Sequence, residues 1–153
     1  MTAALVAVAA FTLTSPAFLS GGLIPTTYTC DGAGGSPPLR WGAPRGTRSL
    51  ALSMKDPDAP GGTFVHWTAW NLSPRARTLA RGQRLPLEGR NSAGRRGYTP
   101  PCPPSGHAPH YVFRLYALRS KLRLAAGASP AAFDRALRGR VIAVAKLVGR
   151  YRR

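Results

Sequence analysis

The stretch TFVHWTAWNL, residues 63–72, indicates a β-strand more clearly than any other part of the sequence. Aromatic and β-branched residues dominate it, and such side chains suit a pleated, half-buried surface. Successive side chains of a strand point to opposite faces. The expected division is therefore Phe64, His66, Thr68 and Trp70 on one face, and Val65, Trp67 and Ala69 on the other. Under this division His66 lies on a mostly apolar face.

Strands are also expected on both sides of this stretch. The segments SLALSMKD (residues 49–56) and HYVFRLYALRS (residues 110–120) have the composition of strands, and so does the apolar segment that begins at Val141. FTLTSPAF (residues 11–18) is a shorter alternating segment, whereas residues 75–110 have almost no periodicity and are expected to form a loop.

One helix is expected, late in the chain. Ser129 is a suitable N-cap, Pro130 fits the first helical position, and Phe133 and Leu137 are spaced to share one helix face. The chain also contains 17 Gly and 15 Pro, which favours many short elements joined by turns. Together these features predict a mostly β protein, an antiparallel β-sandwich with one short helix near the C-terminus.

The length of 153 residues is typical of one domain, which we place at residues 11–153. The apolar segment MTAALVAVAA (residues 1–10) lacks a charged n-region, so it is either the remainder of a signal peptide or a strand with a frayed end. The first reading predicts a periplasmic or secreted protein, and the second a cytoplasmic one. No apolar run is long enough to span a membrane.

The formal net charge is +17, from 22 Lys and Arg against five Asp and Glu. The positive residues are scattered, with no run of five or more like charges and no aromatic stacking motif of the RNA-binding type. This distribution predicts weak, salt-sensitive contact with polyanions or acidic lipid, and no specific nucleic-acid recognition.

Two of the five acids, Asp56 and Asp58, belong to KDPDAP (residues 55–60), where Pro57 and Pro60 restrict the backbone around them. A carboxylate at this strand end is a suitable partner for the imidazole of His66. The alternative is purely structural: an aspartate that caps a turn and a histidine satisfied within the core.

The remaining histidines, His107 and His110, lie in TPPCPPSGHAPHY (residues 99–111), at the start of a predicted strand. The proline-rich run from residue 100 to 104 is rigid and cannot take part in a sheet ladder, so it is expected to form a wall. An aspartate, histidines and such a wall predict a small polar pocket for an anion at one end of the sandwich. The two cysteines, Cys30 and Cys102, match no zinc or redox motif.

Three segments carry a resemblance to a known family: DPDAPGGTFVHWTAWNL (residues 56–72), NSAGRRGYTPPCPPSGHAPHYVFRLYAL (residues 91–118) and YTCDGAGGSPPLRW (residues 28–41). They resemble the phosphatidylethanolamine-binding protein (PEBP) family, in particular its bacterial and archaeal branch of Raf-kinase-inhibitor-like proteins. The resemblance extends from about Phe11 to Tyr151. It implies a large antiparallel sheet packed on a smaller one, with an anion pocket that accepts phosphate or a phosphorylethanolamine head group.

Matched residue by residue, the resemblance implies that Asp56 fixes the imidazole of the pocket histidine, His66. Pro109 stands where the family has a second pocket histidine, so His110 or His107 is left to complete the site. Asp58 is expected to brace the turn. The full set of implied ligand-binding residues is Asp56, His66, Pro103, Pro104, His110 and Tyr111, supported by Asp58, Phe64 and Cys102. The resemblance also brings Cys30 and Cys102 to the same end of the fold, either as a disulfide or as two thiols.

Three classes of function follow. The first is a module that binds a small anion or phosphorylated head group, without cofactor or metal. The second is a protein that inhibits a kinase or protease by direct contact. The third is a hydrolase that uses the Asp–His pocket, but no serine or cysteine stands in a complete catalytic arrangement, and Cys102 near His110 is the nearest candidate. We therefore expect a binding protein rather than an enzyme.

Overall fold

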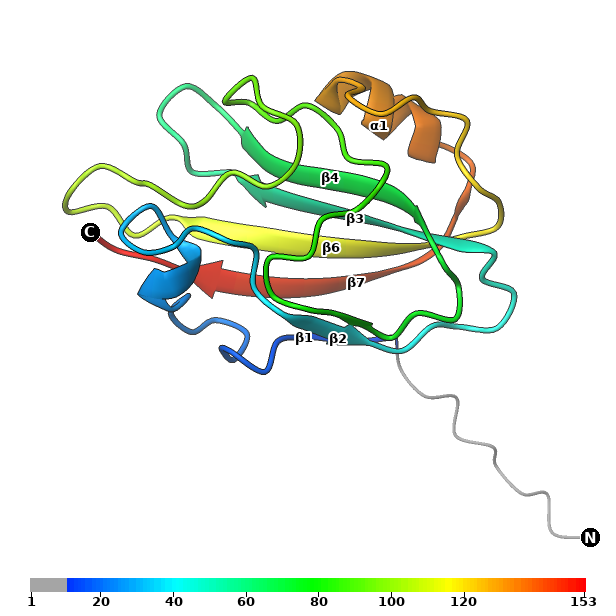
Figure 1. The fold of residues 1–153 in the computed structure, drawn as a ribbon, viewed down its shortest axis with the longest axis horizontal. Helices are drawn as coiled ribbons and strands as arrows, with labels where there is room; N and C mark the ends of the chain where they lie inside the picture. Colours follow the sequence, from blue (N-terminus) through cyan, green and yellow to red (C-terminus); the bar gives the residue numbers. More distant parts are fainter. Residues whose placement is uncertain (1–10) are drawn as a thin grey trace, which may run out of the picture.

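The computed structural model describes residues 11–153, so the predictions for residues 1–10 fall outside the described part of the chain (Figure 1). Strands form most of the regular structure, with one α-helix and one short 3-10 helix. In chain order the elements are β1 (Leu13–Thr14), η1 (Thr26–Tyr28), β2 (Leu39–Trp41), β3 (Ser49–Asp56), β4 (Phe64–Leu72), β5 (Thr78–Leu79), β6 (His110–Leu118), α1 (Pro130–Leu137) and β7 (Val141–Arg150).

Two antiparallel sheets make up the fold. The larger has four strands in the order β4-β3-β6-β7, and the smaller has three in the order β1-β2-β5. The predicted antiparallel β-sandwich, a large sheet on a smaller one, is confirmed. The short strand β5 lies in a segment that the sequence predicted as loop, because a strand of two residues is too short to show a periodicity.

Both faces of the large sheet pack against other elements, although Ile142, Val144 and Lys146 of β7 stay exposed. One face packs against the small sheet, and its core includes Phe113, Leu115, Leu39 and Trp41. The other packs against α1, where the ring of Phe133 lies 6.0 Å from that of Trp70. Complete burial of one such side chain contributes about 1.5–3 kcal/mol. This second core holds α1 beside β4, at the top of Figure 1.

The helix begins as the sequence predicted. The Ser129 hydroxyl accepts a hydrogen bond from the amide of Ala132 at 3.1 Å, and Pro130 opens the helix. Phe133 and Leu137, the two positions expected to share an apolar face, are both buried. The local signals at this helix and its tertiary packing therefore agree.

The expected division of β4 into two alternating faces is wrong, because the strand contains bulges. Val65 pairs with Lys55 and Trp67 with Met54, so His66 is an extra residue without a partner on β3. An extra residue shifts the alternation by one position. The ring of His66 consequently lies 5.3 Å from Tyr111 in the core between the sheets, whereas Trp70 faces α1.

A loop covers the free edge of β4. The amide of Ser92 donates to the carbonyl of Val65 at 2.8 Å, and the amide of Thr99 donates to the carbonyl of His66 at 2.9 Å. The loop satisfies backbone groups that an uncovered edge strand would expose. It also brings Thr99 beside the bulge at His66.

Candidate functional site

A pocket of about 570 Å³ opens at the end of the large sheet where β3 ends and β6 begins. The β3–β4 turn, the proline-rich segment and the last residue of β7 surround it. The structure brings every residue of the predicted site to this one pocket, together with others that the sequence did not indicate. The lining consists of Asp56, Asp58, Ala59, Pro60, Phe64, His66, Ala93, Thr99, Pro100, Cys102, Pro103, Pro104, His107, Ala108, Pro109, His110, Tyr111 and Arg150.

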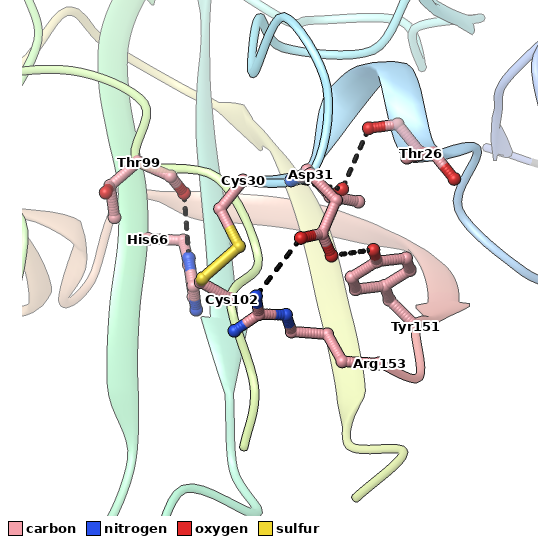
Figure 2. The surroundings of a disulfide bond; sticks show 9 residues. Thr26, Cys30, Asp31, His66, Thr99, Cys102, Tyr151 and Arg153 are labelled. Atoms are coloured by element: carbon pink, nitrogen blue, oxygen red, sulfur yellow. Dashed lines mark hydrogen bonds and ion pairs between the residues drawn. A yellow bond between two sulfur atoms is a disulfide. The ribbon is translucent and has the colours of Figure 1, made fainter. Parts of the chain in front are cut away.

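His66 is the most buried histidine of the pocket, with only 5% of its surface exposed. Its Nδ1 lies 2.8 Å from the carbonyl oxygen of Thr99 (Figure 2). The rings of Phe64 and Tyr111 pack against it at 4.7 Å and 5.3 Å. Burial lowers the pKa of His66, against a smaller opposing effect of the Thr99 carbonyl. The imidazole is therefore held rigidly and favours its neutral form.

The predicted contact between Asp56 and His66 is not formed. One oxygen of the Asp56 carboxylate, Oδ1, accepts a hydrogen bond from the amide of Asp58 at 2.8 Å, and the His66 ring is oriented by Thr99 instead. The reason is the covering loop, whose backbone reaches the bulge and places its carbonyl beside Nδ1. Burial raises the pKa of Asp56, partly offset by the Asp58 amide. Asp56 lines the pocket as a separate acidic group.

The side chain of Asp58 connects two elements rather than bracing its own turn. Its Oδ2 accepts hydrogen bonds from the backbone amide of His110 at 2.8 Å and from Nδ1 of the same residue at 2.7 Å. These bonds lower the pKa of Asp58. The prediction that Asp58 has a structural role agrees with this geometry, but it fastens the turn to the first residue of β6.

The sequence left open whether His110 or His107 completes the site, and both line the pocket. His110 lies at the mouth, exposed and paired with Asp58, and His107 lies on the preceding exposed loop. Pro109, at the position where the resemblance implies a histidine, is buried and contributes an apolar wall. Most of the pocket wall is apolar, so polar contacts concentrate on a few groups.

The sequence reasoning missed Arg150 and Thr99. Arg150 on β7 lies opposite His110 on β6 in the strand register. Its Nη2 donates to the carbonyl of Ala108 at 2.7 Å. Thr99 contributes its backbone carbonyl, for which no side-chain pattern exists. Arg150 could be assigned to the pocket only once the register of β6 and β7 was known.

A disulfide joins Cys30 and Cys102 at the side of the pocket (Figure 2). The bridge closes a long loop, with a sequence separation of 72 residues, and in the chain-entropy account such a loop contributes about 4 kcal/mol. Cys102 is therefore not a free thiol in this structure. The hydrolase alternative that relied on its nucleophilicity loses its nucleophile while the bridge is intact.

Polar contacts reinforce the disulfide. The amide of Cys30 donates to the carbonyl of Pro101 at 3.0 Å. Asp31 accepts a hydrogen bond from the Tyr151 hydroxyl and pairs with Arg153 at 3.2 Å. The Tyr151 hydroxyl bond, aided by Arg153, lowers the pKa of Asp31. These contacts fix the loop around Cys30 against both the proline-rich wall and the C-terminal residues.

Within residues 11–153, no three His, Cys, Asp or Glu side chains group closely enough to hold a metal ion. No helix in the same range is long and apolar enough to cross a bilayer.

The family model described as phosphatidylethanolamine-binding protein matches residues 14–152. The chain belongs to this family. The resemblance inferred from the sequence motifs is thereby confirmed.

The chain is also similar to proteins of archaea and bacteria. The PEBP chain is 46% identical over 149 residues to a UPF0098 protein of Methanothermobacter thermautotrophicus, covering 92% of this chain and 98% of the relative. It is 42% identical over 144 residues to the putative lipoprotein LppC of Mycobacterium tuberculosis, covering 92% of this chain and 71% of the relative.

Solved structures agree with the fold. A putative PEBP homolog, CT736 of Chlamydia trachomatis, superposes with a TM-score of 0.90 at 41% identity, covering 94% of this chain and 98% of that one. YbcL of E. coli, described as a member of the mammalian PEBP family, gives a TM-score of 0.87 at 33% identity, with the same coverage.

Proposed function

We propose that this PEBP chain is a binding module for a small anion, most simply a phosphate group or a phosphorylated head group such as phosphorylethanolamine. One observation carries the proposal: His66 is buried at the pocket with Nδ1 committed to Thr99, which leaves Nε2 available to a ligand. A rigid polar group in a mostly apolar pocket is the usual arrangement for specific recognition of a small ligand.

The charges around the pocket support an anion that carries a cationic or neutral substituent. The guanidinium of Arg150 favours the anion, while Asp56 and Asp58 offer acceptors to an ammonium or hydroxyl group. The net charge of +17 attracts anionic ligands and acidic surfaces without selecting among them.

We propose binding rather than catalysis as the activity of this pocket. Cys102 is in a disulfide, and His66 is hydrogen-bonded to a carbonyl oxygen rather than to the hydroxyl of a serine or threonine. Inhibition of a kinase or protease by direct contact remains the second candidate, since the pocket and a protein-contact surface are compatible on one fold.

The test is a titration with phosphate and with phosphorylethanolamine, followed by NMR of the histidine side chains. We expect the His66 imidazole resonances to shift before those of His107, because His66 lies within the pocket and His107 on an exposed loop. A His107→Ala variant is the matched control and should bind normally. Saturating phosphate that leaves His66 unmoved would refute the anion site.

A protein partner that binds equally well with and without phosphate, and that a His66→Ala variant still captures, would favour the inhibitor candidate instead.

A further inference from the structure

The position of the hydrogens on His66 limits which anions the pocket accepts. A carbonyl oxygen only accepts hydrogen bonds, so Nδ1 must donate to Thr99 over the 2.8 Å between them. The amide of Thr99 also donates to the carbonyl of His66 at 2.9 Å, so two bonds hold these residues together. In the neutral ring the single hydrogen is therefore on Nδ1, and Nε2 is a bare acceptor.

A bare Nε2 cannot contact a fully deprotonated anion, because both atoms offer only lone pairs. Either the ligand brings a hydrogen or the ring gains a proton. The surroundings do not protonate the ring in advance. His66 is 5% exposed, and within residues 11–153 the carboxylate–histidine pair is formed by Asp58 with His110, not with His66.

We propose, on the basis of the anion site proposed above, that the pocket binds its anion together with one proton, held between Nε2 of His66 and a ligand oxygen. Hydrogen phosphate and singly protonated phosphomonoesters bring this hydrogen as P–OH, which donates to Nε2. Sulfate and phosphodiesters lack it, so they bind only when a solvent proton joins Nε2 and converts the ring to imidazolium. The site thereby distinguishes phosphate from sulfate by the proton it carries.

Other titratable or charged groups face the same pocket from the surrounding elements and must be separated from His66. They are Asp56 on β3, Asp58 on the β3–β4 turn, His107 and His110 near the start of β6, Tyr111 on β6 and Arg150 on β7. Burial raises the pKa of Tyr111, so its hydroxyl keeps its proton near neutral pH. Burial also raises the pKa of Asp56, which makes Asp56 the alternative carrier of the proton.

Calorimetric titration with sodium sulfate and with sodium phosphate between about pH 5.5 and 8 tests the proposal, in buffers of different ionisation heat that report proton uptake. Sulfate affinity should fall about tenfold per pH unit above the pKa of His66, with one proton taken up per sulfate bound. Phosphate affinity should fall much less over the same range, since the ligand supplies the hydrogen. Sulfate binding that is independent of pH would overturn the proposal.

Three variants assign the proton. His66→Gln should abolish the pH dependence of sulfate binding, whereas His107→Gln and Asp56→Asn should keep it. Loss of the dependence in Asp56→Asn, with its retention in His66→Gln, would place the proton on Asp56 and contradict the assignment.

If His66→Gln does not fold, the protonation of His66 can be measured in the wild-type protein. In ¹⁵N NMR the Nε2 resonance of His66 should move from its unprotonated to its protonated position when sulfate is added, and an unchanged resonance in saturated protein would overturn the proposal. If neither anion binds at any pH, the proposed anion site itself is wrong. Binding of both anions without proton uptake contradicts only this inference.

Discussion

Strand β4 contains two bulges, and the side chains at them differ in how far the protein satisfies them. At Asn71 the side chain forms a closed pair with Leu122: Nδ2 donates to the carbonyl at 3.0 Å and Oδ1 accepts from the amide at 2.8 Å. At His66, Nδ1 is bonded to Thr99, and within residues 11–153 no partner is found for the other ring nitrogen. Both bulges turn a polar side chain toward a neighbouring loop, but one is saturated within the protein and the other keeps a free ring nitrogen at a pocket.

The two side chains show how a polar group satisfied within the protein differs from one that lines a pocket, although both lie in the same strand. Asn71 satisfies both a donor and an acceptor beside the core around α1, and an unsatisfied buried group there would cost free energy. His66 leaves Nε2 unpartnered within the described residues and next to a cavity. The Asn71 end of β4 should therefore determine stability, and the His66 end should determine binding.

The largest expected effect tests whether stability at the Asn71 end of β4 is independent of binding at the His66 end. Phe133→Ala removes a completely buried ring that packs on Trp70, and should lower the free energy of unfolding by about 3–5 kcal/mol. Phosphate affinity of the folded variant should not change, because the pocket does not include α1. Urea denaturation and a phosphate titration measure the two quantities. A folded variant that no longer binds phosphate would show that the ends are coupled.

A smaller effect is expected at Asn71 itself. Asn71→Ala removes two hydrogen bonds and leaves alanine at a φ of 56°, so it should lower the free energy of unfolding by about 2–3 kcal/mol. Asn71→Gly is the matched control, since glycine tolerates this backbone conformation. The glycine variant should recover about 1 kcal/mol in denaturation experiments. Equal losses in both variants would mean that backbone strain contributes nothing here.

The smallest effect concerns the pH dependence of stability at the His66 end. The pKa of His66 is lowered in the folded protein by burial, so the folded state binds a proton less readily than the unfolded one. Stability from this group is complete above the unfolded pKa of about 6.5 and declines as the pH falls from there toward the folded pKa. Thermal denaturation of the wild type and of His66→Gln should show a shallower decline in the variant over this range. Identical profiles would mean that His66 does not titrate differently on folding.

Most of the large sheet could be predicted from the sequence. The segments around β3, β4, β6 and β7 are long enough to show composition and periodicity, and the Ser129–Pro130 pair marks the helix start with side chains that act locally. The turn with Asp56 and Asp58 and the segment with Pro103 and Pro104 were also found locally, because proline restricts its own neighbourhood. Short strands such as β5 could not be found, since pairing with β2 rather than their own sequence creates them.

The site illustrates the same limit at the level of single contacts. The sequence indicated which residue types belong to the pocket, yet it paired His66 with Asp56. The actual partner is the backbone carbonyl of Thr99, and a backbone atom carries no sequence signal. Arg150 was likewise invisible until the register of β6 and β7 placed it opposite His110.

The sequence by itself determined the family, the mostly β architecture and the residue types of the pocket, because motifs and periodicity are local properties of the chain. The tertiary structure decided which way His66 points. A strand with perfect alternation would place this side chain with Trp70, on the face toward α1. The bulge shifts the alternation by one residue, and only the pairing of β4 with β3 determines where a bulge occurs.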